Sequence, residues 1–357
     1  MSLFEQLEKL TQTSGVSGFE GEIAAVILEM WQPLVDSAEI DALGNVIATK
    51  RGTGDAPRKR LMLSAHMDEL GLMVHSIETF NGYGFLRVLP IGGVDIRQLI
   101  GQRVTVHGTQ KFIGVIGALP YSMLPEDKRG QAHGYETFLV DVGVSAETVQ
   151  AHINVGDVIT FNQPIHKLRG GRVATNAIDN RACVAALTVA LDYLQTRLHK
   201  WDIVIVATIQ EETRLLGGFT AAFSQKPDAA IALDVAFAKQ PSVSDAGTQP
   251  LGSGPMIDIG VNVHPGMYKQ LRKSAETLEM KTTILAHTRS SGTEASAVQL
   301  TEAGIPTGLI SIPIRNMHTM VETVDLKDIT RAGRLAGEFA AQLNDQFLDT
   351  LRDDLFV

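Results

Sequence analysis

The chain has 357 residues, which is more than a single domain usually contains, so two domains are expected. Hydrophobic residues make up 44% of it and charged residues 20%, a composition that excludes a disordered chain and supports a large core. The net charge of −9 argues against a nucleic-acid partner, because no basic stripe offsets it, and no apolar run reaches the roughly 18 residues of a membrane span.

Two helices followed by two β segments are predicted within the first 68 residues. The helices are expected over residues 3–12 and 22–35, with a Gly-rich turn at 15–22 between them. The β segments are expected over 38–50 and 60–66. The start of the chain is amphipathic and carries acids, so it is not expected to be a signal peptide.

Helical periodicity nearly vanishes from about residue 69 to residue 165. Short β-like pieces replace it, separated by Gly, Pro and Asn, at 71–78, 84–91, 103–108, 112–119, 137–143 and 157–161. We therefore expect residues 69–165 to form a β-barrel-like domain inserted into a catalytic α/β domain made of residues 1–68 and 166–357.

Strand and helix patterns alternate again from residue 166 to the end of the chain. The last of them, over 328–355, predicts a strongly amphipathic helix. The single cysteine, Cys183, excludes an internal disulfide framework, fits a reducing cytoplasm and is expected in the core. The fold class that follows is α/β, a mostly parallel sheet flanked by helices, with the inserted β domain.

Carboxylates and imidazoles follow several of the apolar runs that predict buried strands, and one carboxylate precedes a helical pattern. Ligands of open α/β sheets bind beyond the carboxyl ends of the strands, so these groups should meet at one edge. A set of imidazoles and carboxylates without a thiolate suits zinc, cobalt or manganese. We therefore predict a two-metal hydrolase centre built from His66, Asp68, Asp179, Glu211, Glu212, Asp234 and His318.

The spacing of these residues in the sequence suggests a role for each. Residues i and i+2 of a strand face the same way, so His66 is expected as a ligand and Asp68 as the carboxylate that orients its ring. Asp179 has two oxygens with which to bridge two cations. Glu211 and Glu212 are adjacent and diverge, so one is expected as a ligand and the other as general base toward the attacking water.

Each position also has an ordinary structural alternative. His66 alone would be read as a strand-end histidine bonded to backbone, Asp179 as a helix cap, and Asp234 as a solvated turn residue. Their clustering favours the metal interpretation. The other histidines do not belong to this set of candidate ligands and are expected to be structural or at the surface. They are His75, His107, His133, His152, His166, His199, His264 and His287.

The ordered segments AHMDE, AIDNR, QEE, ALD and PIRNMHTMVE resemble the M42 family of metallo-aminopeptidases, and the likeness covers essentially the whole chain. It implies a zinc-peptidase-like catalytic domain with a metal pair bridged by Asp179, followed by a cis peptide to Asn180. It further implies Glu211 as base and Asp68 orienting His66. For the ligands it implies Asp234 and His66 on one ion and Glu212 and His318 on the other, with the alternative that His66 pairs with Glu212 and Asp234 with His318.

Two residues depart from the family pattern. Arg214 follows the Glu pair where a small, Gly-containing segment is usual, and Glu294 stands in SSGTEA where the family carries Asp. Neither removes a proposed ligand, and both are expected near the substrate side chain, so the preferred N-terminal residue is left open.

The resemblance implies a cytoplasmic enzyme that removes N-terminal residues from short peptides with two divalent ions, zinc or cobalt first and manganese as an alternative. It also implies a homo-oligomer, with dimers formed through the insertion and a twelve-subunit shell built from them, against the alternative of a monomer with the insertion as a lid. The alternative functions are a deacylase of N-acyl amino acids and a non-catalytic assembly subunit. An endoglucanase role is disfavoured, because it needs two carboxylates flanking a glycosidic bond instead of a metal cage.

Overall fold

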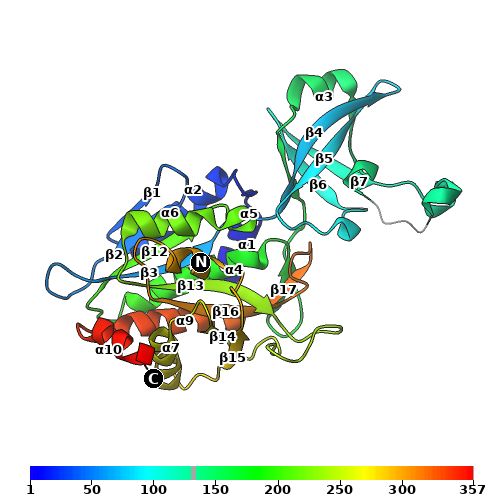
Figure 1. Ribbon diagram of the computed structural model, residues 1–357. Helices are drawn as coiled ribbons and strands as arrows, with labels where there is room; N and C mark the ends of the chain where they lie inside the picture. The colour runs from blue at the N-terminus through cyan, green and yellow to red at the C-terminus, as the bar shows by residue number, and fades with distance from the viewer. Residues whose placement is uncertain (130–133, 357) are drawn as a thin grey trace.

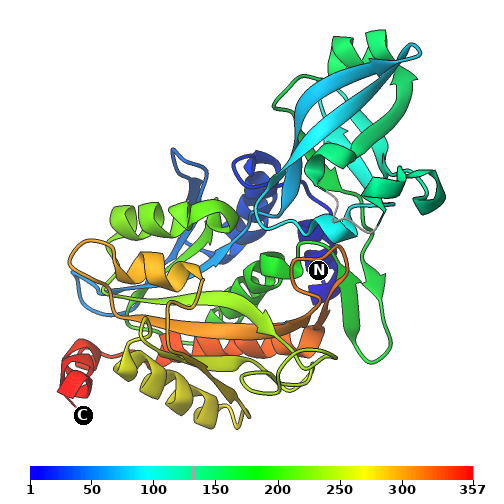
Figure 2. The ribbon, with the colours of Figure 1, turned by 45° about the vertical axis from the view of Figure 1, so that its right-hand side comes forward.

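A computed structural model describes residues 1–129 and 134–356 of the protein. It has two parts, an α/β body and a smaller β-barrel that stands off one side of it (Figure 1, Figure 2). Both chain termini lie in the α/β body, and the barrel is drawn in cyan to green because it comes from the first half of the chain. Within the described ranges, no helix is long and apolar enough to cross a membrane.

The barrel confirms the expected inserted β domain. Its six antiparallel strands close in the order β4-β5-β8-β7-β6-β9. Along β6, Val104 and Val106 are buried while Thr105 is less so, which is the alternation expected of a strand with one core-facing side. The strand bounds are β4 Gly71–Phe80, β5 Tyr83–Ile91, β6 Arg103–His107, β7 Lys111–Gly117, β8 Leu139–Ser145 and β9 Val158–Phe161.

A short helix in the insertion was not predicted. Helix α3 (Ala146–His152) begins after Ser145, whose hydroxyl accepts a hydrogen bond from the backbone N–H of Thr148 at 3.1 Å. Only Val149 of this helix is buried. The helix therefore has no apolar stripe from which its period could be read.

The α/β body is built on one mixed sheet of 11 strands. Its main path runs β1-β2-β12-β3-β13-β16-β17-β11-β10, and β14 pairs with both β15 and β16. The strands β12, β3, β13 and β16 are parallel, as expected. The bounds are β1 Ser37–Ile40, β2 Val46–Lys50, β3 Arg60–His66, β10 His166–Lys167, β11 Arg172–Thr175, β12 Asp202–Thr208, β13 Ala229–Phe237, β14 Met256–Gly260, β15 Thr283–His287, β16 Thr307–Arg315 and β17 Glu322–Asp325.

Helices cover both faces of the sheet. On one face α4 and α9 pack together over the central strands, with α1 against α4, and on the other α6 and α8 pack over β12, β3, β13 and β16. Cys183 of α4 is fully buried, as expected. The bounds are α1 Leu3–Thr11, α2 Gly21–Trp31, α4 Ile178–Leu194, α5 Glu211–Arg214, α6 Leu216–Gln225, α7 Pro265–Thr277, α8 Glu294–Gln299, α9 Leu326–Gln342 and α10 Phe347–Asp353.

The prediction of one helix over 328–355 is wrong, because the helix is interrupted between α9 and α10. Leu343 adopts extended backbone angles. The carbonyl of Asn344 accepts a hydrogen bond from the indole N–H of Trp201 at 3.1 Å, and its side chain accepts one from the N–H of Gln346 at 3.0 Å. Tertiary contacts thus interrupt a continuous apolar period.

Candidate metal centre

The register of the parallel strands brings His66 and Asp234 to the same level of the sheet. His66 is the last residue of β3 and pairs with Thr208 of β12. On the other side of β3, β13 pairs with it in parallel, from Ala229 opposite Leu61 as far as residue 232. If this register is continued by two residues, Asp234 lies level with His66. Strand β13 does not end at Asp234, as the sequence suggested, but runs on to residue 237 beside β16. The pairing with β3 stops at residue 232, so Asp234 lies just past the paired residues, beside the end of β3.

Sharp turns bring the other side chains to the same edge. Glu211 and Glu212 begin α5 directly after Gln210, whose φ of 54° turns the chain in the left-handed region. Asp179 lies near the start of α4, and its peptide bond to Asn180 is cis, as the resemblance implied. His318 lies in the loop after β16, itself at a φ of 59°.

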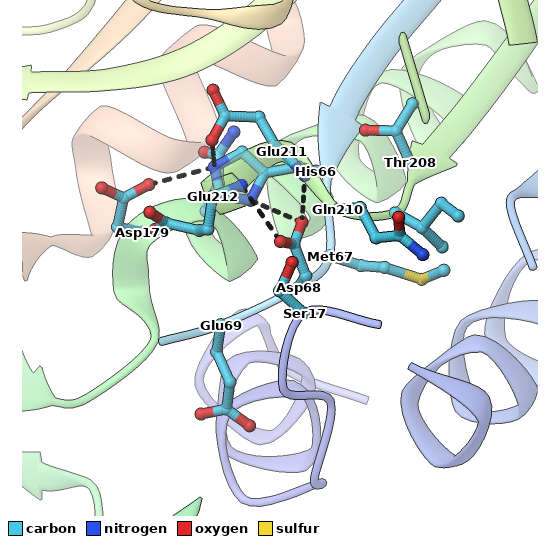
Figure 3. Close-up of polar contacts among 12 residues, drawn as sticks. Ser17, His66, Met67, Asp68, Glu69, Asp179, Thr208, Gln210, Glu211 and Glu212 are labelled. Carbon is cyan, nitrogen blue, oxygen red and sulfur yellow. Dashed lines mark hydrogen bonds and ion pairs between the residues drawn. The ribbon is translucent and has the colours of Figure 1, made fainter. Parts of the chain in front are cut away.

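The two oxygens of Asp179 face two different imidazoles. Asp179 Oδ1 lies 3.2 Å from His66 Nε2, and Asp179 Oδ2 lies 3.4 Å from His318 Nε2. Each imidazole has a second carboxylate beside it, Glu211 Oε2 at 3.7 Å from His66 Nε2 and Glu212 Oε2 at 3.9 Å from His318 Nε2. Figure 3 shows His66 among Asp68, Asp179 and the Glu pair.

Two overlapping sets of donor atoms are close enough to hold a metal ion. In each set the atoms lie within 4.8 Å of one another: His66, Glu211 and Asp234 form one, and His66, Asp179 and Glu212 form the other. His318 belongs to neither set but contacts Asp179 and Glu212 of the second. All five predicted ligands and Glu211 therefore meet in one place.

The charges of this cluster fit a cationic occupant. Burial, followed by repulsion among the acids, raises the pKa of Glu211 and of Glu212 to about 8 and raises that of Asp234 as well. Burial opposes ionisation of Asp179 too, but hydrogen bonds with His318 and His66 lower its pKa. Among the described residues no Lys or Arg forms an ion pair with these four carboxylates. Divalent metal ions would supply the missing positive charge.

Asp68 connects the imidazole on β3 to the start of α5. It is fully buried, and its Oδ1 lies 3.3 Å from His66 Nδ1, on the side of the ring away from Asp179. Its two oxygens also accept hydrogen bonds from the backbone N–H groups of Glu211 at 3.0 Å and Glu212 at 3.1 Å. The same carboxylate thus contacts the ring and fixes the turn that carries the Glu pair.

Glu322, the first residue of β17, was not predicted as part of the site. Its carboxylate is buried and accepts the backbone N–H of Asp179 at 2.9 Å and that of His318 at 2.8 Å. It therefore ties together the start of α4, which carries Asp179, and the loop that carries His318. In the sequence Glu322 is the last residue of the segment PIRNMHTMVE, but no role was predicted for it.

The cluster opens into a cavity of about 400 Å³. Arg214 lines this cavity together with residues 213 and 215 of the same turn, residues 291–293 and Met317. Glu294 does not line it. Its carboxylate is fully buried, accepts a hydrogen bond from the Thr208 hydroxyl at 3.0 Å, and has its pKa raised by burial to about 7.

The other histidines take no part in this cluster. His107 contacts the Thr160 hydroxyl at 2.8 Å, and His199 contacts the carbonyl of Trp201 at 2.8 Å. His287 contacts the buried Asp258 at 2.6 Å. His133 lies outside the described residues.

Comparison with known proteins agrees with this geometry. The profile of the M42 glutamyl aminopeptidase family matches residues 44–335. A lysyl aminopeptidase of Pyrococcus furiosus is 36% identical over 346 residues, 95% of this chain and 97% of its own. The structure of an aminopeptidase from the archaeon Desulfurococcus kamchatkensis superposes with a TM-score of 0.89 at 33% identity, covering 98% of this chain and 97% of that one.

A TET1 peptidase of Pyrococcus horikoshii, described as assembling into a tetrahedron or a large octahedral shell, superposes with a TM-score of 0.83 at 30% identity, covering 96% of this chain and all of that one. The relatives span the α/β body and the barrel alike, because they cover almost the full length of the chain. The chain therefore belongs to the M42 family of metallo-aminopeptidases.

Proposed function

We propose that this aminopeptidase uses two divalent metal ions to hydrolyse the N-terminal peptide bond of short peptides. The observation that carries the proposal is the position of Asp179, one oxygen toward His66 at 3.2 Å and the other toward His318 at 3.4 Å. A carboxylate between two imidazoles is the arrangement that a bridged metal pair needs. Zinc or cobalt suits these donors best, with manganese as the alternative.

In the proposed ligand assignment, His66 and Asp234 would hold one ion and Glu212 and His318 would hold the other, with Asp179 available to both. The closeness of His66 to Asp234 supports the first pair, and the 3.9 Å between Glu212 and His318 supports the second. Glu211 is also near His66 and Asp234, so geometry alone would allow it as a third ligand. We assign it as the base because Glu212, and not Glu211, lies beside both Asp179 and His318, and because Asp179 would already supply the bridge.

The bound ions would polarise the scissile carbonyl and make the attacking water more acidic. Glu211 takes the proton from this water and later returns it to the nitrogen of the leaving amine. Asp68 acts through its neighbours, because it orients the ring of His66 and fixes the backbone of Glu211. The acidic edge of the cavity attracts the protonated α-amino group of the peptide, which restricts cleavage to the first bond.

We further propose that the catalytic domain comprises residues 1–68 and 166–357, and that the insertion, 69–165, joins subunits into dimers from which a twelve-subunit shell is built. Apolar side chains exposed on the barrel support this, among them Leu89, Ile113 and Val115. The shell-forming TET1 relative supports it too. A cytoplasmic location is proposed on the single, buried cysteine.

An assay with paired substrates tests the proposed function. Aminoacyl-p-nitroanilides and their N-acetylated counterparts are compared with and without added zinc or cobalt. Cleavage of the free-amine substrates alone, dependent on metal, is expected. Release of acetate from the acetylated substrates would instead indicate a deacylase, and no cleavage of either substrate by fully metal-loaded protein would indicate an assembly subunit without chemistry.

A further inference from the structure

A second cavity of about 950 Å³ lies away from the metal centre. It is formed by the end of α7, the start of β15, the loop at residues 249–253 and the outer side of α9. In Figure 1 these elements lie at the end of the α/β body opposite the barrel. None of the residues that line it lines the cavity of the metal centre.

The walls of this cavity carry an excess of positive charge. Four cationic side chains line it against two exposed acids, Glu276 and Glu279. No ion pair joins any of the four cations to another residue in the described parts of the chain. The four cations are Arg272, Lys281, Arg331 and Arg334.

One wall is held rigidly in place. The buried carboxylate of Asp328 accepts hydrogen bonds from the backbone N–H groups of Gly252 and Gly254, each at 2.7 Å. One turn further along α9, the guanidinium of Arg331 donates to the carbonyl of Gly252 at 2.9 Å. The loop and this guanidinium are therefore fixed before any ligand arrives, which lowers the entropic cost of binding.

The cavity lining also contains polar and apolar groups that could contact the organic part of a small-molecule ligand. The hydroxyls of Ser253, Thr282 and Thr283 can donate hydrogen bonds, and Leu278 and Met280 provide partly buried apolar surface. The volume lies at the upper end of the range for small-molecule sites. Planar guanidinium groups recognise phosphate oxygens by paired hydrogen bonds.

We propose that this cavity binds a phosphate-bearing small molecule, with Arg272, Arg331 and Arg334 around the phosphate and the organic part against Leu278 and Met280. The shared chemistry is the phosphate group, which a free phosphate ion or a nucleotide could supply. The site is separate from the metal centre, so its occupancy can be measured without reference to peptide hydrolysis.

Isothermal titration of the metal-loaded, full-length protein tests the proposal, with inorganic phosphate, AMP and adenosine as probes. Phosphate and AMP are expected to bind once per chain, and adenosine, which lacks the charge, is not. Tighter binding of AMP than of phosphate would identify the nucleotide as the better source. Both dissociation constants should rise with added sodium chloride, because the contacts are ionic.

The double variant R272Q/R334Q should raise the dissociation constant about tenfold or more, since two charge-assisted contacts are lost. The matched control is R103Q/R169Q, which removes two exposed arginines that lie outside the cavity, and it should bind like the parent. If R272Q/R334Q does not fold, K281Q removes an exposed cation of the same wall and should weaken binding by itself.

Three results would overturn the proposal. The first is the absence of saturable binding by phosphate and AMP. The second is undiminished binding by R272Q/R334Q, which would place the anion elsewhere, the metal centre included. The third is a change of particle mass in R272Q/R334Q while the parent binds no anion, which would identify the cavity as a contact between copies of the chain.

Discussion

The carboxylate of Asp68 accepts a hydrogen bond from the backbone N–H of Glu211, with 3.0 Å between the nitrogen and Oδ1. The same Oδ1 lies 3.3 Å from Nδ1 of His66. A single buried acid therefore sets the positions of a proposed ligand, at the end of β3, and of the proposed base, at the start of α5. Because Asp68 also accepts the backbone N–H of Glu212, the separate roles of Glu211 and Glu212 are the first to test.

The first prediction separates the base from its neighbouring ligand. Glu211→Gln should keep both metal ions but lose turnover by about 10²–10⁴-fold, the usual contribution of general-base catalysis. Metal content is measured by atomic emission after dialysis, and turnover with an aminoacyl-p-nitroanilide. The substitution keeps the side-chain volume, so the cavity should not change shape.

Glu212→Gln is the matched comparison, because it makes the same change one residue along the chain. It should lose metal on dialysis, since an amide is a poor substitute for a carboxylate ligand. A Glu211→Gln protein with near-normal turnover and full metal content would refute the base assignment. Loss of metal from Glu211→Gln instead of Glu212→Gln would exchange the two roles.

The sequence indicated the candidate site residues that follow apolar runs, but not Glu322, which binds the backbone N–H groups of two site residues. His66, Glu211 and Glu212 could be found because each follows a run of buried strand residues. Asp234 was also among the candidates, although the expectation that its strand ends there was wrong: β13 runs on to Phe237, and only its pairing with β3 stops earlier, at residue 232. Glu322 was missed because its two hydrogen bonds are to N–H groups of loops whose approach no local pattern encodes.

The second prediction concerns Glu322. In Glu322→Gln the remaining side-chain oxygen can still accept one of the two backbone N–H groups. The amide nitrogen then faces the second N–H group, donor against donor, so the segments that carry Asp179 and His318 should shift. We expect about 10- to 100-fold weaker metal affinity, the usual effect of losing a group that orients ligands. Metal affinity is measured by competition with a chelating dye.

The control is Glu338→Gln, a buried acid of α9 that accepts hydrogen bonds from the Tyr193 hydroxyl and from Gln342. It should lower the melting temperature and leave metal affinity alone. Equal metal affinity in Glu322→Gln and the parent would show that Glu322 serves stability only.

The third prediction is metal dependence without metal-dependent folding. Chelation should abolish activity and a divalent ion should restore it, while far-UV circular dichroism changes little. The core is supplied by apolar strands such as β12, whose residues from Ile203 to Thr208 are all buried, so the fold does not rest on the ions. Activity that persists after verified removal of metal would contradict the proposed mechanism.

The fourth prediction uses Asp328, which lies in the first turn of α9 and does not line the cavity of the metal centre. Burial raises its pKa from 3.8 to about 6 in the folded protein, although N–H bonds from Gly252 and Gly254 act in the opposite direction. Between these two values the folded state holds more protons than the unfolded state, so its free energy of unfolding should fall as pH rises. Above about 6 this dependence should level off.

Asp328→Asn removes the titrating group, so the difference in unfolding free energy, parent minus variant, isolates its contribution. Urea denaturation of both proteins across this pH range measures that difference. It should decrease with rising pH up to the folded pKa and then stay constant. A difference that grows with pH would mean that the N–H bonds outweigh burial and that the pKa is lowered.

The last prediction is assembly through the barrel. Ile113 and Val115 lie on the outer side of β7 and are 59% and 46% exposed, an unusual position for two branched apolar side chains on one strand. Contact with another copy of the chain would cover these side chains. Light scattering should therefore give a mass well above the 38.6 kDa of one chain, and I113K/V115K should lower it by placing two charges in the contact.

The matched control is L198K/V261K, which changes two exposed apolar residues of the α/β body and should keep the parent mass. Circular dichroism on both variants checks that the lysines have not unfolded the protein. Because β7 is already paired on both sides within the barrel, by β6 and β8, the contact would be made by side chains and not by added strands. A parent protein that stays at the mass of one chain at every concentration would refute the assembly, and the barrel would then be left with the role of a lid.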